Sequence, residues 1–354
     1  MPENLRPIAC ALAAAALFGA STPAAKALVE VMHPLLLAGL LYAGSGLGLA
    51  AWLVVRRVSG SGQPLGLRGP DFAWLAGAVL AGGVAGPVML VSGLARTSAA
   101  GASLLLNLES VFTALIAWFA FRENFDRRIA AGMALIVAGG VLLALEPGAF
   151  DGTATGAMHG TLLVAAACLA WALDNNLTRR ISSGDATAIA ATKGCVAGAI
   201  NLSLAAAAGA AWPGSRVALA SAMVGLAGYG VSLVLFVLAL RGLGAARTGA
   251  YFCTAPFFGV FVALAFLGET PPALFWAAAA LMASGVWLHV SEKHAHAHTH
   301  DRLEHSHAHR HDAHHQHSHD AEWNGKEPHV HVHQHDALRH SHPHYPDIHH
   351  RHRH

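Results

Sequence analysis

Long apolar runs dominate the first 290 residues of this 354-residue chain, and short polar segments separate them. Each run has roughly 18–25 residues, which at about 1.5 Å per helical residue spans the roughly 30 Å hydrocarbon core of a bilayer. Helices are expected because each satisfies its own backbone in lipid, and the runs lack the alternation of barrel strands. We therefore predict an all-α integral membrane protein with ten transmembrane helices. The runs cover residues 8–28, 34–55, 72–94, 98–121, 129–146, 159–178, 187–211, 217–240, 246–268 and 273–290.

The composition agrees with a membrane protein and gives no sign of an enzyme. Hydrophobic residues make up 54% of the chain and charged residues 12%, about half the charged share of a soluble domain. The four cysteines all lie in apolar runs without a CxxC pair, so neither a disulfide framework nor a zinc site is implied. The sequence holds no P-loop, nucleophile–base pair or dinucleotide-binding glycine motif. We expect no enzymatic activity, no required cofactor and no nucleic-acid partner.

Lysine and arginine are distributed unevenly between the two sides of the predicted bundle. With the N-terminus inside, ten of them fall in inner loops and three near the outer ends of helices. Cytoplasmic loops carry the excess of positive charge, so we predict a bacterial-type plasma (inner) membrane protein with both termini in the cytoplasm. The inner residues are Arg56, Arg57, Arg68, Arg122, Arg127, Arg128, Arg179, Arg180, Arg241 and Arg247, and the outer ones are Lys26, Arg96 and Arg216.

The body of the chain contains an internal repeat. Residues 18–26 (FGASTPAAK) align with residues 171–179 (WALDNNLTR), 153 positions later. Residues 110–123 (SVFTALIAWFAFRE) align with residues 256–269 (PFFGVFVALAFLGE), 146 positions later. The smaller second offset indicates that the second copy has a shorter loop after its second helix. Because the first run has an internal counterpart, we expect it to be a retained span rather than a cleaved signal peptide.

The number of spans in each copy determines how the copies are related. Five spans are an odd number, so the second copy is inverted relative to the first, as in many secondary transporters. We therefore predict a first five-helix repeat over residues 1–150 and an inverted second repeat over residues 151–291. A substrate site is expected between the two halves, near the midplane of the membrane.

Each of the two five-helix copies contains one of the aligned segments 110–123 and 256–269 near its end. Two copies arranged in this way resemble the EamA family of the drug/metabolite transporter superfamily, over about residues 6–291. The segment 108–115 (LESVFTAL) closely follows the fourth-helix pattern of that family. The resemblance implies a ten-helix transporter and no particular substrate. The family usually has proline where this chain has Ser110, whereas Pro256 keeps it in the second copy. We therefore expect the fourth helix to be straighter than the ninth.

Glu109 is the leading candidate for a substrate or coupling-ion site. It lies near the middle of the fourth run, about 16–18 Å from either end, and Asn107 accompanies it two residues earlier. Charged side chains inside a membrane are costly and usually functional. Because burial disfavours the charged form of a carboxyl, Glu109 could exchange a proton for a solute. The alternative is a permanently hydrogen-bonded, structural carboxyl.

A polar block in the sixth run supplies further candidates. Asp174 and Asn175 could line the floor of a cavity, but Arg179 and Arg180 follow at once and make an interfacial ion pair an equally good interpretation. Lys193 lies about one to two turns inside the seventh run. It could pair with Asp174 or attract an anionic solute, or its long stem could snorkel to the surface.

Other polar and aromatic residues are expected to have structural roles. Glu123 and Glu269 end the fourth and ninth runs on opposite sides, where they are expected to cap helices or pair near loops. Lys26 ends the first run and is expected to snorkel at the outer surface. Aromatic residues of the second half, Tyr229 among them, either pack between helices or line a cavity for organic solutes.

Residues 292–354 form a histidine-rich tail, with 23 of the 26 histidines between residues 294 and 354. With few apolar anchors the tail is predicted to be disordered, on the cytoplasmic side. Its alternating imidazoles suit Ni, Co, Zn or Cu, held in several loose sites. The candidate ligands are His294, His296, His298, His300, His305, His307, His309, His311, His329, His331, His333 and His335.

These features leave three functions open. The leading one is a secondary transporter in the lipid bilayer that exports a small metabolite or toxic compound, with proton exchange as the suggested coupling. The second is an exporter of Ni, Co or Zn in which the tail collects the metal ion at the inner mouth. The third is a membrane protein that only tethers a metal-sequestering tail, which the repeat argues against because a tether needs one span. The pattern predicts no particular oligomeric state.

Overall fold

The computed structural model describes most of the chain as two compact units, Met1–Ser291 and Glu292–His354. The described residues are 5–59, 69, 71–121, 127–145, 154–181, 185–290, 295–300, 303–309, 329–335 and 338–343. Each unit is treated by itself below.

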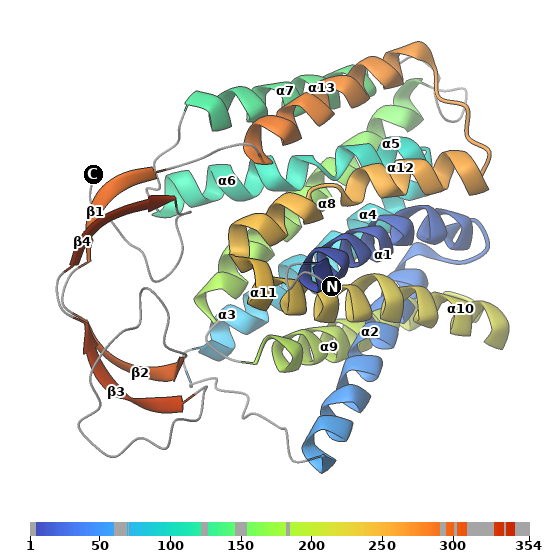
Figure 1. Cartoon of the computed structure of the whole chain (residues 1–354). Helices are drawn as coiled ribbons and strands as arrows, with labels where there is room; N and C mark the ends of the chain where they lie inside the picture. The colour runs from blue at the N-terminus through green and yellow to red at the C-terminus, as the bar shows by residue number, and fades with distance from the viewer. Residues whose placement is uncertain are drawn as a thin grey trace. The chain divides into compact units, whose positions relative to one another are not determined.

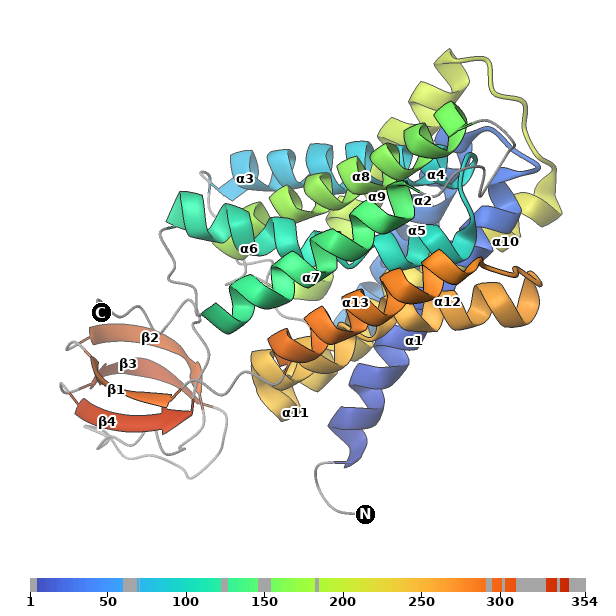
Figure 2. The ribbon, with the colours of Figure 1, turned by 90° about the horizontal axis from the view of Figure 1, so that it is seen from above.

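The first unit is a bundle of helices (Figure 1 and Figure 2). Two of its spans contain an internal π-helix, named η1 and η2. The elements of the first half are α1 Leu5–Val29, α2 Pro34–Val58, α3 Asp71–Ala78, η1 Val79–Ala85, α4 Gly86–Leu94, α5 Ala99–Leu105, α6 Leu108–Phe121 and α7 Arg127–Ala144. Those of the second half are α8 Ala154–Arg180, α9 Ala186–Ala207, α10 Ser215–Gly225, η2 Leu226–Val231, α11 Ser232–Phe252, α12 Ala255–Phe266 and α13 Ala273–Val290.

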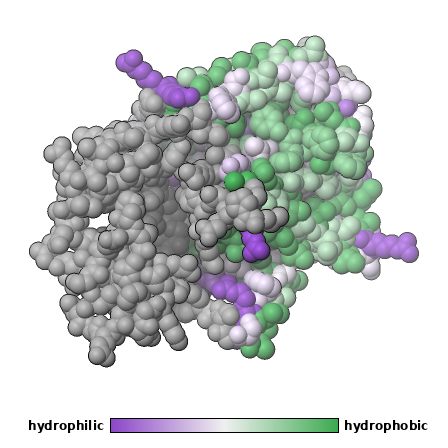
Figure 3. Space-filling model, viewed as in Figure 1, coloured by the Kyte–Doolittle hydropathy of each residue, from purple (hydrophilic) through white to green (hydrophobic). Residues whose placement is uncertain are grey.

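The helices of this unit suit a membrane by length and by surface. Among the described residues, eight helical stretches are long and apolar enough to cross a bilayer, and two apolar helices near the C-terminal end of the unit are shorter. Large apolar side chains such as Leu47, Trp52 and Phe119 are exposed on the outside of the bundle, and Figure 3 shows hydrophobic residues over much of its described surface. Lipid, rather than water, is the solvent that such a surface requires.

The predicted bounds of the eighth and ninth apolar runs implied a helix break between residues 240 and 246. The structure has no break there. Helix α11 continues from Ser232 to Phe252, and the chain leaves the helix only at Cys253 and Thr254. The break falls there because Pro256 follows within the first turn of α12, where a missing N–H group costs nothing. The segment between the two runs holds no proline, so its helical hydrogen bonds continue.

The fourth span is also interrupted, so both the fourth and the ninth span are broken, and the prediction of a straighter fourth helix was wrong. Helix α5 ends at Leu105 and α6 begins at Leu108, without any proline. Side chains make this break instead. Asn107 Nδ2 donates to Leu104 O at 2.9 Å, and Ser110 Oγ donates to Asn107 O at 2.7 Å. Such local bonds compete with the regular helical pattern.

Small residues allow the backbones of the bundle to approach closely. Helix α2 packs along α9, and a Cβ atom placed on Gly46 would lie 2.3 Å from Cys195 N. On the other side of α2, a Cβ atom on Gly44 would lie 2.1 Å from Ala222 O. Close helix contacts of this kind hold membrane bundles together where no hydrophobic driving force exists between helices. They fix α2 between the two helices that follow α8.

In the second unit the described residues form four short strands, within a tail that the sequence predicts to be disordered. β1 Ala295–His300 pairs with β4 Leu338–Pro343, and β2 Leu303–His309 pairs with β3 His329–His335, both antiparallel. An alternation of histidine with small residues has the period of two that a strand requires. The side chains of this unit lie outside the described part of the structure.

Candidate functional site

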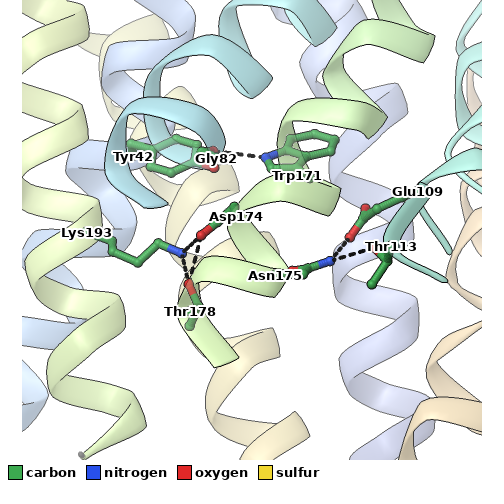
Figure 4. A network of polar contacts seen from close by, with 9 residues as sticks. All are labelled: Tyr42, Gly82, Glu109, Thr113, Trp171, Asp174, Asn175, Thr178 and Lys193. Atoms are coloured by element: carbon green, nitrogen blue, oxygen red, sulfur yellow. Dashed lines mark hydrogen bonds and ion pairs between the residues drawn. The ribbon is translucent and has the colours of Figure 1, made fainter. Parts of the chain in front are cut away.

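Helix α8 carries two polar clusters, one on each side, as Figure 4 shows. The first joins α8 to α9. Lys193 Nζ lies 2.5 Å from Asp174 Oδ1 and 3.2 Å from Thr178 Oγ1, and Thr178 Oγ1 donates to Asp174 Oδ1 at 2.8 Å. Both charged side chains are largely buried, with 16% of Lys193 and 11% of Asp174 exposed. The ammonium and the carboxylate therefore neutralise each other inside the bundle.

The second cluster joins α8 to α6. Asn175 Nδ2 donates to Glu109 Oε1 at 2.8 Å and to Thr113 Oγ1 at 3.4 Å. Asn175 is exposed and Glu109 is partly exposed, although both belong to membrane-spanning segments. Within the described residues no lysine or arginine forms an ion pair with Glu109. The Glu109 carboxyl therefore has a neutral hydrogen-bond partner at Oε1, and the residue remains partly exposed.

Two asparagines near this cluster have structural contacts. The Asn176 amide is buried and donates to Ala172 O at 2.8 Å and to Thr113 O at 3.3 Å, so it bridges α8 and α6. The amide of Asn107 donates to Leu104 O in the helix break. Asn107 thus helps to place Glu109 at the start of α6 and makes no described contact with its carboxyl.

The π-helix η1, called the η1 wall below, was not predicted from the sequence. A π-turn offsets the backbone hydrogen-bond pattern, and three side chains from other helices bind the carbonyl groups of this one. Tyr42 Oη and Trp171 Nε1 both donate to Gly82 O, at 2.6 and 2.9 Å, and Asn201 Nδ2 donates to Gly83 O at 2.9 Å. The signal in the sequence was the glycine-rich segment 82–86, which is also an ordinary packing motif.

The contact between α8 and η1 has a counterpart in the other half of the bundle. A Cβ atom on Gly82 would lie 1.9 Å from Asp174 Oδ2, and one on Gly228 of η2 would lie 2.5 Å from Ser21 Cβ. Gly228 follows Gly82 by 146 residues, and Asp174 follows Ser21 by 153 residues, the two offsets of the sequence repeat. The same packing contact therefore occurs twice, once with a carboxylate and once with a hydroxyl.

Aromatic rings gather beside the second π-helix. Tyr229 of η2 packs edge-on against Phe18, with ring centroids 5.8 Å apart, and lies 5.6 Å from Tyr42. Phe18 also contacts Phe252, at 5.4 Å, and Phe252 contacts Phe236, at 4.9 Å. All five rings are partly exposed. Charged and amide side chains thus gather on α8, whereas most of the aromatic contacts gather at η2, and Tyr42 contacts both π-helices.

Lys26 and Glu269, both near the ends of spans, have defined partners in the structure. Lys26 Nζ donates to Leu94 O at 2.9 Å and lies 3.6 Å from Glu30, so it binds protein groups rather than only snorkelling. The Glu269 carboxylate accepts from the backbone N–H groups of Ala99 and Ala100, at 2.7 and 2.9 Å. The side chains of Glu123, Arg179 and Arg180 lie outside the described residues.

The predicted metal ligands fall on the second unit. Ten of the twelve lie on the strands β1, β2 and β3, and the register places His305, His307 and His309 opposite His333, His331 and His329. His294 and His311 lie outside the described residues, as do all the side chains of the tail. Among the side chains that the structure describes, no group of three histidine, cysteine or acidic residues is placed to hold a metal ion.

The helical bundle with a broken fourth and ninth span can be compared with known proteins. The model of the EamA-like transporter family matches residues 5–145 and again residues 158–291. The chain therefore belongs to the EamA-like transporter family, as predicted from the residues at the end of each repeat. Together with the long apolar helices, this makes it a multi-pass membrane protein of a transporter family.

Two relatives and one solved structure illustrate the likeness. An uncharacterized transporter of Methanothermobacter thermautotrophicus is 28% identical over 281 residues, 77% of this chain and 82% of that protein. A probable 4-amino-4-deoxy-L-arabinose-phosphoundecaprenol flippase subunit ArnE of Pseudomonas paraeruginosa is 42% identical over 112 residues, 31% of this chain and 93% of that protein. A crystal structure at 22% identity superposes with a TM-score of 0.58, over 79% of this chain and 95% of the other, and shows the shared fold.

Proposed function

We propose that this protein is a secondary transporter that exports a small metabolite or toxic organic compound in exchange for protons. The observation that supports it most directly is the position of the Glu109 carboxyl and the set of groups that contact it. Its carboxyl lies within a spanning segment, binds the exposed amide of Asn175 and has no described cationic partner. An ionisable group without a counter-charge at such depth is expected to bind a proton or a solute.

The geometry favours a site at which proton and solute compete. The Asn175 amide donates to one carboxyl oxygen of Glu109, which leaves the other oxygen for a proton or for a donor group of the solute. Asp174 and Lys193 already neutralise each other, so their role is to give the site a polar wall of zero net charge. Tyr229 and Phe18 would supply the opposite, apolar wall. A solute with one polar end and a flat apolar body matches both walls.

Ten spans in two inverted repeats are part of the same proposal. The two π-helices and their matching contacts at Asp174 and Ser21 support the repeat. Inverted halves can exchange conformations, so a site between them is open to one side of the membrane at a time. The excess of arginine in one set of loops supports cytoplasmic termini.

A second candidate is the export of Ni, Co or Zn, which the histidine-rich tail favours. Alternating imidazoles bind these ions, and the tail would concentrate metal ions next to the transport site. The polar groups that surround Glu109 are an amide and a hydroxyl, which are weaker ligands for such ions than imidazole or thiolate. We therefore place metal export second, and a simple tether for the tail third.

Growth tests on a strain that lacks this protein separate the candidates. A panel of organic compounds and of Ni, Co and Zn salts is applied, and rescue is measured with the full chain, Glu109→Gln, and a version that ends at Lys293. The proposal expects compound tolerance to return with the full chain and the shortened version, but not with Glu109→Gln at equal membrane abundance. Glu30→Gln, at an exposed residue outside the site, is the matched control. Rescue by Glu109→Gln would overturn the role of Glu109, and metal sensitivity alone would favour the second candidate.

A further inference from the structure

We propose that Glu269 is a positioning residue that latches one end of the transport path, through the broken span that carries Glu109. This end is the one at which α1 finishes at Val29 and α2 begins at Pro34, and it is called the α1–α2 end below. The inference extends the proposed function by naming a residue that controls access to the same site. It depends on contacts that the function proposed above does not use.

The carboxylate of Glu269 caps a helix that is far away in the chain. Its two oxygens accept separately from the N–H groups of Ala99 and Ala100, the first two residues of α5. Ser98 Oγ accepts from the third free N–H group, that of Gly101, at 2.9 Å. Hydrogen bonds from backbone N–H groups to a carboxylate are stronger than neutral ones, and the positive end of the helix adds attraction. A residue of the second half therefore holds the start of a helix of the first half.

The connection between α4 and α5, residues 95–98, is also bound at its other end. Helix α4 ends at Leu94, and Lys26 of α1 donates to the carbonyl group of that residue. Residues 95–98 thus lie between two charged side chains, one bound to the end of α4 and one to the start of α5. In the middle of this segment Thr97 is only 2% exposed. Thr97 is therefore packed inside the protein at the α1–α2 end, while Ala95 and Arg96 of the same segment are exposed.

The two parts of the fourth span differ in exposure. Every residue of α5, from Ala99 to Leu105, is buried, and α5 packs against α12. Helix α6 continues the span but packs against α8 and α7, and its residues Glu109 and Thr113 are partly exposed. The part of the fourth span that carries Glu109 is therefore partly exposed, whereas the part that Glu269 caps is buried throughout.

The second half of the bundle does not have the corresponding break. Ser98 aligns with Gly244 at the offset of 146, yet Gly244 lies inside the continuous helix α11, Ser232–Phe252. The two repeats therefore have different backbone conformations at equivalent positions. Alternating access requires such a difference, because exchanging the conformations of the two halves exchanges the open and closed ends. The capped break is thus a feature of one state, and release of Glu269 would accompany the change to the other.

Helix α5 provides the connection to the site. It has only seven residues, and the two-residue break at Leu106 and Asn107 separates it from Glu109. A short helix held at its start by Glu269 and at its end by the Asn107 amide can move only as a unit. Movement of its capped end would displace the first turn of α6, in which Glu109 lies.

Two single-cysteine reporters test the latch without any substrate. The four native cysteines are replaced, and either Thr97→Cys or Thr113→Cys is introduced into the full chain in detergent. A water-soluble maleimide then measures the reactivity of each reporter with native Glu269, Glu269→Gln and Glu269→Ala. Glu30→Gln is the control, because Glu30 is 62% exposed and contacts Lys26 without touching α5.

The proposal expects opposite changes at the two reporters. Glu269→Ala should raise the reactivity of the Thr97→Cys reporter at least fivefold and lower that of the Thr113→Cys reporter, while Glu269→Gln, which keeps one acceptor oxygen, should give an intermediate effect. Glu30→Gln should change neither. An unchanged Thr97→Cys reporter, or a rise at both reporters as in local unfolding, would overturn the latch. Loss of rescue by Glu109→Gln together with unchanged reporters would keep the transport function and reject the latch alone.

Discussion

Asp174 of α8 and Lys193 of α9 form an ion pair inside the helical bundle, and Thr178 hydrogen-bonds to both. The carboxylate also lies against Gly82 of η1, where no larger residue would fit. One residue thus connects two helices of the second repeat to the π-helix of the first. The ion pair, the π-helix and the neighbouring Glu109 cluster lead to separate predictions.

Breaking the ion pair should destabilise the bundle more than removing both charges. Asp174→Asn leaves the largely buried ammonium of Lys193 uncompensated, and we expect a loss of about 3 kcal/mol in the free energy of unfolding. The double variant Asp174→Asn with Lys193→Met should recover at least half of this loss. Denaturant unfolding in detergent measures both. Glu30→Gln, in an exposed pair, should cost less than about 0.5 kcal/mol, and a double variant as unstable as the single one would contradict the pair's role.

Glycine at position 82 should be required for the η1 wall. In Gly82→Ala the new methyl group would lie 1.9 Å from Asp174 Oδ2, so either the ion pair or the π-helix must shift. We expect a fall in the midpoint of thermal unfolding of about 5 °C or more, which corresponds to roughly 2 kcal/mol in a chain of this size. Gly249→Ala is the matched control, because no atom lies within 4 Å of its added carbon. Equal unfolding midpoints for the two variants would count against the close contact.

Two adjacent asparagines should have separable effects. Asn175 is exposed and donates to Glu109, whereas Asn176 is buried and bridges α8 and α6. Asn175→Ala should reduce compound tolerance at least tenfold in the growth test and change the unfolding midpoint little. Asn176→Ala leaves the Thr113 carbonyl without that donor and should cost about 1–2 kcal/mol in stability. The reverse assignment, with stability lost at Asn175 and tolerance kept, would remove Asn175 from the proposed site.

The tail should account for most metal binding by the protein. Calorimetric titration with NiCl₂ is expected to show several sites of micromolar affinity in the full chain, because neutral imidazoles in an extended alternating segment can share an ion. A version that ends at Lys293 should lose these sites and keep the unfolding midpoint, since residues 1–291 form a compact unit of their own. Metal binding that persists after truncation would instead point to ligands in the helical unit.

Run length and internal repetition were sufficient to predict a helical membrane protein of the EamA-like family. In lipid each spanning segment must satisfy its own backbone hydrogen bonds, so it forms a helix. The number of consecutive apolar residues therefore indicates whether that helix is long enough to cross the bilayer. Glu109 and Asp174 were recognisable for the same reason, because a carboxyl in an apolar run is too costly to be accidental. The pairing of Asp174 with Lys193 was one of the alternatives that the spacing left open.

Side-chain contacts between distant segments decided the remaining features. The π-helix at Gly82 and the cap from Glu269 depend on donors or acceptors supplied across the bundle, 40 positions away for Tyr42 and 170 and 169 positions away for Glu269. The break at Asn107 is made by local side-chain bonds, which the run of apolar residues did not reveal. Periodicity reports which residues face lipid or protein, but it carries no information on which helix supplies a given partner. That choice is made when the helices pack, because only then does an unsatisfied carbonyl or N–H group meet the side chain that binds it.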